Sequence, residues 1–200
     1  MIVDLRSDTV TRPTPAMRRA MADAEVGDDV LEEDPTVIRL EAEAAEVLGQ
    51  EAALFVPSGT MANQISIRCL TEPGDELVLE AGAHPFHYEA GGAGVISGVT
   101  LRMVEGVEGH LTPERLRAAI RPYNVHHAPP TLLSIENTAN RGGGRVLGVA
   151  GTAALIQTAR SFGMSVHLDG ARVWNAAAAL GCAETELAGA FDLVSACFSK

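Results

Sequence analysis

Short apolar runs alternate with helical segments along this chain, and that alternation constrains its fold more than any other feature. The apolar runs predict strands at residues 52–56, 76–79, 100–104, 131–135, 165–169 and 192–198. Helical periodicity and helix-start signals mark residues 34–48, 60–70, 112–120, 151–162 and 172–180. Strands that are joined through helices form parallel sheets with helices on both faces. We therefore predict an α/β fold of three layers, with a mostly parallel sheet between two layers of helices.

Two of the predicted strands lead to charged residues. The run 165–169 ends in Asp169, and the last run leads directly to Ser199 and Lys200. A lysine that follows a buried strand is costly unless it is paired, used covalently or placed at the mouth of a cleft. Pyridoxal phosphate needs this pair, because an aspartate keeps the pyridine nitrogen protonated and a lysine forms a Schiff base. The pair predicts such a site, while a solvated strand end explains Lys200 alone and a helix N-cap explains Asp169 alone.

The turn Ser58-Gly59-Thr60 joins the predicted strand 52–56 to the helix 60–70. Backbone N–H groups and the helix dipole favour a phosphate at a helix start, and glycine permits close approach. The turn is a candidate phosphate site, and an ordinary capped turn explains the same residues equally well.

Three histidines are candidates for contacting a cofactor or transferring a proton. His84 and His87 would share one face of a helix, where one ring stacks on a cofactor and the other moves a proton. His126 precedes the strand 131–135 and either points into a site or is exposed. Surface or capping positions are the alternative for His84 and His87. His167 and Asp169 share one face of their strand, but we find no third ligand and predict no metal.

The chain carries a formal net charge of −11, which argues against nucleic acid or an anionic membrane surface as a partner. No apolar stretch approaches the roughly 20 residues of a membrane helix, and the N-terminus lacks signal-peptide features. We therefore expect a cytoplasmic protein. Residues 1–34 are polar and predict an N-terminal arm that packs on something else, for example another subunit, whereas residues 35–200 predict the cofactor-binding domain.

Long motifs, in order along the chain, resemble the threonine aldolases, which are pyridoxal phosphate enzymes of the aspartate-aminotransferase fold type, fold type I. The matching segments are residues 4–17, 26–30, 33–36, 51–64, 84–92, 136–138, 140–144, 167–172 and 199–200. The resemblance covers nearly the whole chain. It also implies a small C-terminal domain beyond Lys200 and a homotetramer built as a dimer of dimers, with sites shared between subunits.

The resemblance assigns roles to residues of this chain. Lys200 would carry the cofactor and Asp169 would pair with its pyridine nitrogen. The phosphate and ring contacts that it implies are Ser58, Gly59, Thr60, His84 and Arg172. The substrate contacts that it implies are Ser7, Arg172, His87 and His126. Catalytic roles would fall to Lys200, His84, His87 and His126, and spacing leaves open whether His87, His126 or a water is the base.

The resemblance predicts retro-aldol cleavage of L-threonine or L-allo-threonine, a β-hydroxy-α-amino acid, to glycine and acetaldehyde. A β-eliminating lyase or an amino-acid racemase on the same scaffold is the nearest alternative. A non-catalytic protein that has kept the fold is the alternative from another class. The retention of Lys200, Asp169, His84 and Arg172 argues against the latter.

Overall fold

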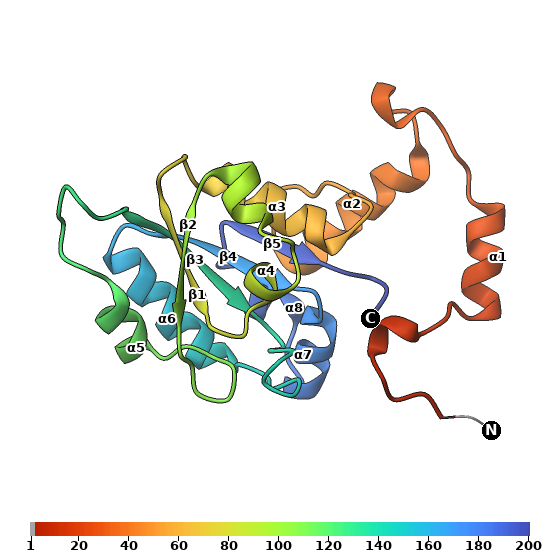
Figure 1. Cartoon of the computed structure of the whole chain (residues 1–200). Coiled ribbons are helices and arrows are strands. Elements are labelled where there is room, and N and C mark those ends of the chain that lie inside the picture. Colours follow the sequence, from red (N-terminus) through yellow and green to blue (C-terminus); the bar gives the residue numbers. More distant parts are fainter. Residues whose placement is uncertain (1–2) are drawn as a thin grey trace. The chain divides into compact units, whose positions relative to one another are not determined.

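A parallel sheet organises the second half of the chain, in the strand order β2-β1-β3-β4-β5 (Figure 1). Its strands are β1 (Glu76–Glu80), β2 (Thr100–Val104), β3 (Pro130–Glu136), β4 (Ser165–Gly170) and β5 (Leu193–Ala196). Each neighbouring pair is parallel. The apolar runs fill the interior, as in β1, where Leu77, Val78 and Leu79 are fully buried. The predicted strands from residue 76 onward are confirmed, although β5 ends at Ala196, two residues before the predicted end.

The structure is a computed structural model that describes residues 3–200. Its longer helices begin and end within two residues of the predicted bounds. Asp34 caps the first long helix by accepting hydrogen bonds from the backbone N–H groups of Thr36 and Val37, and Gly49 ends it in the left-handed conformation. The helices are α1 (Pro15–Asp23), α2 (Pro35–Leu48), α3 (Gly59–Leu70), α4 (His84–His87), α5 (Pro113–Ala119), α6 (Val149–Ser161), α7 (Val173–Leu180) and α8 (Glu184–Ala188), with 3-10 turns η1 (Asp8–Val10) and η2 (Asp29–Leu31) and a π-helical turn η3 (Ala93–Ser97). The short helices α1 and α8 were not predicted.

Helices cover both faces of the sheet. The helix α3 and the turn η3 pack on one face, whereas α5 and α6 pack on the other with α8 beside α6 (Figure 1). This division follows from right-handed crossovers, because the chain moves one way along the sheet from β1 to β2 and the opposite way afterwards. The predicted three-layer α/β fold is confirmed.

The sheet face under α3 changes character from one edge toward the other. At β1 this face is apolar, and Leu77 and Leu79 form a buried cluster with Ile67 of α3. At β4 the same face carries His167 and Asp169, both buried. The alternation of a strand places their neighbours Val166 and Leu168 on the opposite face. Buried polar groups on a face that is otherwise core mark the region around β4 as the candidate site.

The predicted strand at residues 52–56 is wrong. The segment forms no strand, and Leu54 and Phe55 are largely exposed. The backbone N–H of Phe55 donates instead to a side chain of α2, Glu41 Oε1, at 2.6 Å. An apolar run predicts a strand only where a neighbouring strand offers backbone partners, and none pairs with this segment among the described residues.

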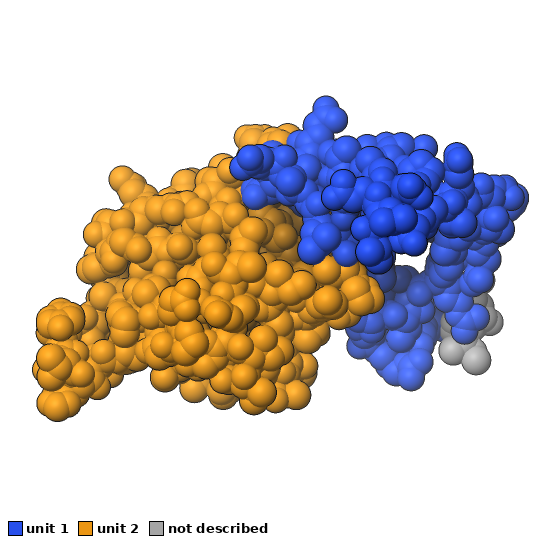
Figure 2. Space-filling view, turned by 90° about the horizontal axis from the view of Figure 1, so that it is seen from above, with its two compact units in different colours: residues 1–55, 198–200 blue, residues 56–197 orange. Residues whose placement is uncertain are grey.

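The described chain divides into two compact units (Figure 2). The first runs to Phe55 and includes Phe198–Lys200, and the second spans Val56–Cys197 and contains the whole sheet. The predicted division at residue 34 stays a prediction. Within the described residues, no helix combines the length and the apolar character that crossing a membrane requires.

Candidate active site

Asp169 lies at the carboxyl end of β4, where sites in parallel α/β folds gather. Its side chain is buried, and Oδ2 accepts a hydrogen bond from Asn63 Nδ2 of α3 at 2.8 Å. The backbone N–H of Ala171 donates to the other oxygen, Oδ1, at the longer distance of 3.3 Å. The strand therefore delivers a carboxylate that α3 holds from one side and that keeps acceptor capacity for a ligand.

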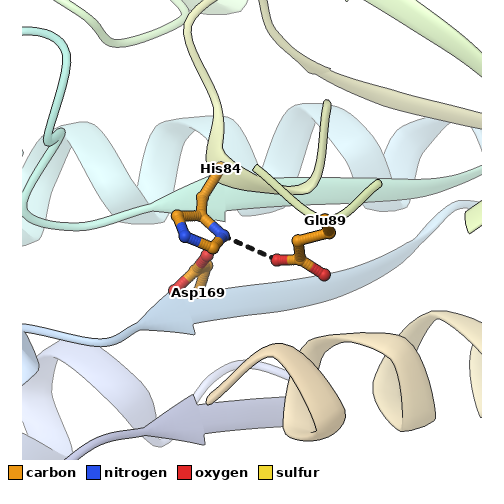
Figure 3. Close-up of side chains that lie close together, drawn as sticks. All are labelled: His84, Glu89 and Asp169. Carbon is orange, nitrogen blue, oxygen red and sulfur yellow. Dashed lines mark hydrogen bonds and ion pairs between the residues drawn. The ribbon is translucent and has the colours of Figure 1, made fainter. Parts of the chain in front are cut away.

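His84 begins α4 and places its ring beside Asp169 (Figure 3). Its backbone N–H donates to Glu136 Oε2 at 2.8 Å, and its ring Nδ1 bonds Glu89 Oε1, also at 2.8 Å. The hydrogen bond with Glu89 raises the pKa of His84 above its ordinary value, and the charges of Asp169 and Glu136 act in the same direction, against burial. The ring therefore favours its protonated form.

Glu89 is a fully buried carboxylate behind His84. Asn63 Nδ2 donates to its Oε1 at 2.8 Å, and Gln64 Nε2 donates to its Oε2 at 2.6 Å. Burial raises the pKa of Glu89, but the hydrogen bonds from His84, Asn63 and Gln64 outweigh burial and hold the pKa below its ordinary value. The carboxylate stays ionised although water does not reach it.

Glu136 closes the site at the end of β3. It accepts hydrogen bonds from the backbone N–H groups of His84 and Asn140, both at 2.8 Å. Burial and the nearby charge of Asp169 raise the pKa of Glu136. Glu136 thus fixes the start of α4 through the backbone.

His167 lies two residues before Asp169 on the same face of β4, and its ring links β4 to the two neighbouring strands. Its ring nitrogens lie 3.0 Å from the hydroxyl oxygens of Ser134 in β3 and Ser195 in β5. Burial lowers the pKa of His167 to about 4, so the ring is neutral at pH 7. A neutral imidazole donates from one nitrogen and accepts at the other, which suits its place between two hydroxyl groups.

The start of α3 provides the predicted turn. Ser58 is the N-cap, and its Oγ accepts a hydrogen bond from Met61 N–H at 3.1 Å. Gly59 is required by space, because a Cβ there would lie 2.7 Å from Cys197 Sγ. Thr60 is exposed in the first turn and lines a groove of about 460 Å³ along α3. The capping role of Ser58 is confirmed, and the phosphate role of the turn stays a prediction.

Three further residues of the second unit were predicted to belong to the site, namely Arg172, His87 and His126. Arg172 begins α7, three residues after Asp169, and is half-buried. His87 shares α4 with His84, but its Nε2 lies 2.8 Å from the carbonyl oxygen of Ala81. His126 is exposed in the loop that leads into the start of β3, whereas Asp169 lies at the carboxyl end of the neighbouring parallel strand β4.

Ser7 and Lys200 both belong to the first unit. Ser7 is the N-cap of η1, where its Oγ accepts a hydrogen bond from Thr9 N–H at 3.2 Å. Thr11, which ends η1, donates from Oγ1 to the carbonyl oxygen of Ser199 at 3.1 Å. The N-terminal segment that carries Ser7 therefore contacts the residue next to Lys200.

Sequence reasoning missed Asn63, Gln64 and Glu89 as site residues. The two amides of α3 hold Glu89 from one side, and Asn63 also holds Asp169. A signal was present, because Asn63 and Gln64 occupy the helical stripe that includes buried Ile67. Polar residues on the inward stripe of a helix indicate a buried polar site.

One ligand-type atom each of His84, Glu89 and Asp169 lies within 4.8 Å of the others. Imidazole nitrogens and carboxylate oxygens are common metal ligands in proteins. The protein itself already supplies hydrogen bonds to all three, through Asn63 and the His84–Glu89 pair. We therefore do not treat them as metal ligands, and the absence of a metal stays a prediction.

Comparison with known proteins gives a consistent result. A family model described as beta-eliminating lyase matches residues 4–200. The chain is 48% identical over 202 residues to low-specificity L-threonine aldolase 1 of Arabidopsis thaliana, covering 99% of this chain and 56% of that protein. It is 40% identical over 200 residues to low specificity L-threonine aldolase of Escherichia coli K12, covering 100% of this chain and 59% of that protein. The chain thus spans little more than half the length of these curated relatives.

A solved structure supports the same fold. Leishmania major threonine aldolase matches with a TM-score of 0.78 at 20% identity, covering 94% of this chain and 56% of that chain. At this identity the likeness concerns the fold alone. It confirms the predicted fold class, which is fold type I of the pyridoxal phosphate enzymes.

Proposed function

The chain belongs to the beta-eliminating lyase family, and on that premise we propose that the whole protein is a pyridoxal 5'-phosphate-dependent aldehyde-lyase. It cleaves L-threonine or L-allo-threonine to glycine and acetaldehyde, as a threonine aldolase does. The observation that carries this proposal is the buried Asp169 carboxylate at the end of β4 with the His84 ring beside it. The names of the relatives at 40% and 48% identity support the choice of reaction.

The described residues fit the cofactor. Asp169 is held by Asn63 and retains acceptor capacity for a protonated pyridine nitrogen. The first turn of α3, with Ser58, Gly59 and Thr60, offers backbone N–H groups to a phosphate. His84 presents a flat ring for stacking on the cofactor. When bound, pyridoxal phosphate supplies an electron-poor ring that accepts the electron pair of the Cα–Cβ bond as that bond breaks.

The residues of the chain then have distinct tasks. Lys200 would hold the cofactor through a covalent bond from its side-chain amine. Arg172 would bind the substrate carboxylate and so fix the orientation of the Cα–Cβ bond, which selects the bond that breaks. Ser7 contacts the carboxylate or the ring hydroxyl. Its place in the segment that contacts Ser199 supports this role.

The proton of the β-hydroxyl group goes to His87, His126 or a water held by them. His126 precedes β3, at the other edge of the sheet from Asp169. A role for it therefore requires the loop of a second copy of the chain. This requirement supports sites shared between subunits, and for the assembly itself we propose a homotetramer built as a dimer of dimers, as the resemblance implies. We further propose that the enzyme acts in the cytoplasm, which its acidic charge and its resemblance support.

Product analysis of the full-length protein tests the proposal. The protein is loaded with pyridoxal phosphate and supplied with L-threonine or L-allo-threonine, and glycine and acetaldehyde are measured in equal amounts. Asp169→Asn should lose most of this cleavage, whereas Glu114→Gln, which changes an exposed carboxylate of α5, should retain it. Pyruvate with ammonia from serine, or racemised alanine, without acetaldehyde would overturn the reaction in favour of elimination or racemisation. Failure to take up the cofactor would overturn the whole proposal.

A further inference from the structure

Glu89 is a buried charge to which the proposed reaction gives no task. Its side chain has no exposed surface, and it follows α4 in a segment without regular structure. Ionised carboxylates are costly in the interior unless donors satisfy them. Here three side chains do so, those of His84, Asn63 and Gln64, at 2.8, 2.8 and 2.6 Å. The donors come from two different elements, so the fold is arranged around this carboxylate.

The contact with Glu89 determines which nitrogen of His84 carries a proton. An ionised carboxylate only accepts hydrogen bonds, so Nδ1 of His84 must be the donor. The second ring nitrogen, Nε2, lies on the side of the ring away from Glu89, and Asp169 lies beside the same ring (Figure 3). In a neutral ring of this tautomer, Nε2 holds the lone pair.

We propose that Glu89 is a positioning residue for His84: it holds the ring by Nδ1–H and leaves Nε2 as the nitrogen that exchanges a proton with a ligand beside Asp169. The identity of that ligand rests on the proposed function, but the pairing of Glu89 with His84 does not. Asn63 extends the arrangement, because its Nδ2 donates to both Glu89 and Asp169. The orientation of the ring is thereby tied to the carboxylate that holds the cofactor.

Three carboxyl groups act on the pKa of His84. Glu89 reaches it from the segment after α4, Asp169 from β4 and Glu136 from β3. From the residue that follows α4, Tyr88, the ring centroid lies 5.3 Å from that of His84. Of the three carboxyl groups, Glu89 bonds the imidazole itself, whereas Glu136 bonds the backbone N–H of His84. Glu136→Gln therefore removes a nearby carboxylate that acts on the imidazole only through its charge and through the backbone of α4, and it serves as the control for general charge effects.

Hydrogen–deuterium exchange at the imidazole C2 carbon, measured by mass spectrometry, reports the titration of single histidines in large proteins. We would record it across pH for the full-length, cofactor-loaded protein and resolve His84 from His87 by fragmentation. The titration midpoint of His84 should move to lower pH in Glu89→Gln and move less in Glu136→Gln. The pH profile of turnover should shift in the same direction in Glu89→Gln.

We expect Glu89→Gln to fold, because a buried acceptor is present for the new side-chain NH2 group. Gln64 Oε1 is buried without a hydrogen-bond partner in the described structure. Rotation of the Gln64 amide would bring this oxygen to the new side-chain NH2 group and replace the bond that Gln64 Nε2 now makes. Glu89→Asp is a second variant, which keeps the charge but withdraws it by one methylene group. It should shift the His84 midpoint in the same direction by a smaller amount, and thermal melting checks each variant.

An unchanged His84 midpoint in Glu89→Gln or Glu89→Asp would overturn the proposal. Equal shifts in Glu89→Gln and Glu136→Gln would also overturn it, because the effect would then come from general charge and not from the ring bond. These outcomes are independent of the proposed reaction. A protein that releases no acetaldehyde still yields the exchange curves of His84.

Discussion

Asn63 and Asp169 are joined by a hydrogen bond of 2.8 Å between α3 and the end of β4. The same nitrogen of Asn63 lies 2.8 Å from Glu89 Oε1. A single amide group thus bridges two buried carboxylates and sets the distance between them. The helix whose first turn we propose for the phosphate, α3, is also the helix that holds Asp169, the proposed partner of the pyridine nitrogen.

Replacement of Asn63 should therefore weaken both the fold and cofactor binding. In Asn63→Ala, two buried carboxylates lose a shared donor, and we expect the free energy of unfolding to fall by about 1–3 kcal/mol. Urea unfolding measures this loss, and titration with pyridoxal phosphate measures the weaker binding. Ser66→Ala changes another buried residue of α3 and should bind the cofactor as the wild type does. Unchanged cofactor affinity in Asn63→Ala would contradict the bridging role.

Replacement of Lys200 tests the covalent link. Lys200→Ala should lose the visible absorbance of the lysine-linked cofactor and should lose turnover, because no other amine stands at this position. Lys200→Arg keeps the positive charge, but a guanidinium group does not form a Schiff base with the cofactor. It should therefore behave as Lys200→Ala does. Circular dichroism checks that both variants fold. Normal turnover in either variant would contradict the assignment.

The fold could be predicted from the sequence where apolar runs are buried on both faces of the sheet. β1 and β3 are of this kind: their central residues are buried, and their continuous apolar runs differ from the helical periodicity of the neighbouring segments. Residues 52–56 show the limit of such reasoning. Their composition is as apolar as that of a buried strand, yet Leu54 and Phe55 are exposed. A strand also requires a neighbouring strand with free backbone groups, which composition does not reveal.

The site could be predicted in part for a similar reason. Asp169 is visible in the sequence because it ends an apolar run, and this position in a parallel sheet is informative by itself. Asn63 and Glu89 come from segments that are distant from it in the sequence. Their convergence depends on how α3 and α4 pack over the sheet, which local patterns do not encode.

His167 should make the fold sensitive to acid. Its pKa is about 4 in the folded protein and 6.5 as its ordinary value, so the unfolded chain binds more protons between these values. Stability should therefore fall as pH decreases from about 6.5 to 4, by on the order of 3 kcal/mol for this group. Urea unfolding at several pH values measures the slope.

Two variants isolate the contribution of His167. His167→Gln should be less stable at neutral pH, because the bonds to Ser134 and Ser195 are disturbed, but its stability should depend less on pH. His127→Gln, in the exposed loop before β3, should keep the wild-type slope. A wild-type slope in His167→Gln would assign the acid sensitivity to other groups, such as His110, whose pKa is lowered by burial.

Gly59 is required by the close approach of α3 to the segment after β5. A Cβ at this position would lie 2.7 Å from Cys197 Sγ, a distance at which the atoms must move apart. Gly59→Ala should therefore lower the free energy of unfolding by about 1–3 kcal/mol, as overpacking does in well-packed interiors. It should also weaken cofactor binding, because α3 must shift together with its first turn.

Gly148 offers the matched control for Gly59. It is the N-cap of α6, with a φ of −68° that any residue adopts, and a Cβ there meets nothing within 4 Å. Gly148→Ala should therefore change the free energy of unfolding by no more than about 1 kcal/mol and leave cofactor binding unchanged. Removal of the clashing sulfur in the double variant Gly59→Ala/Cys197→Ala should restore much of the lost cofactor affinity. If Gly59→Ala alone binds the cofactor normally, the first turn of α3 does not hold the phosphate in the way proposed.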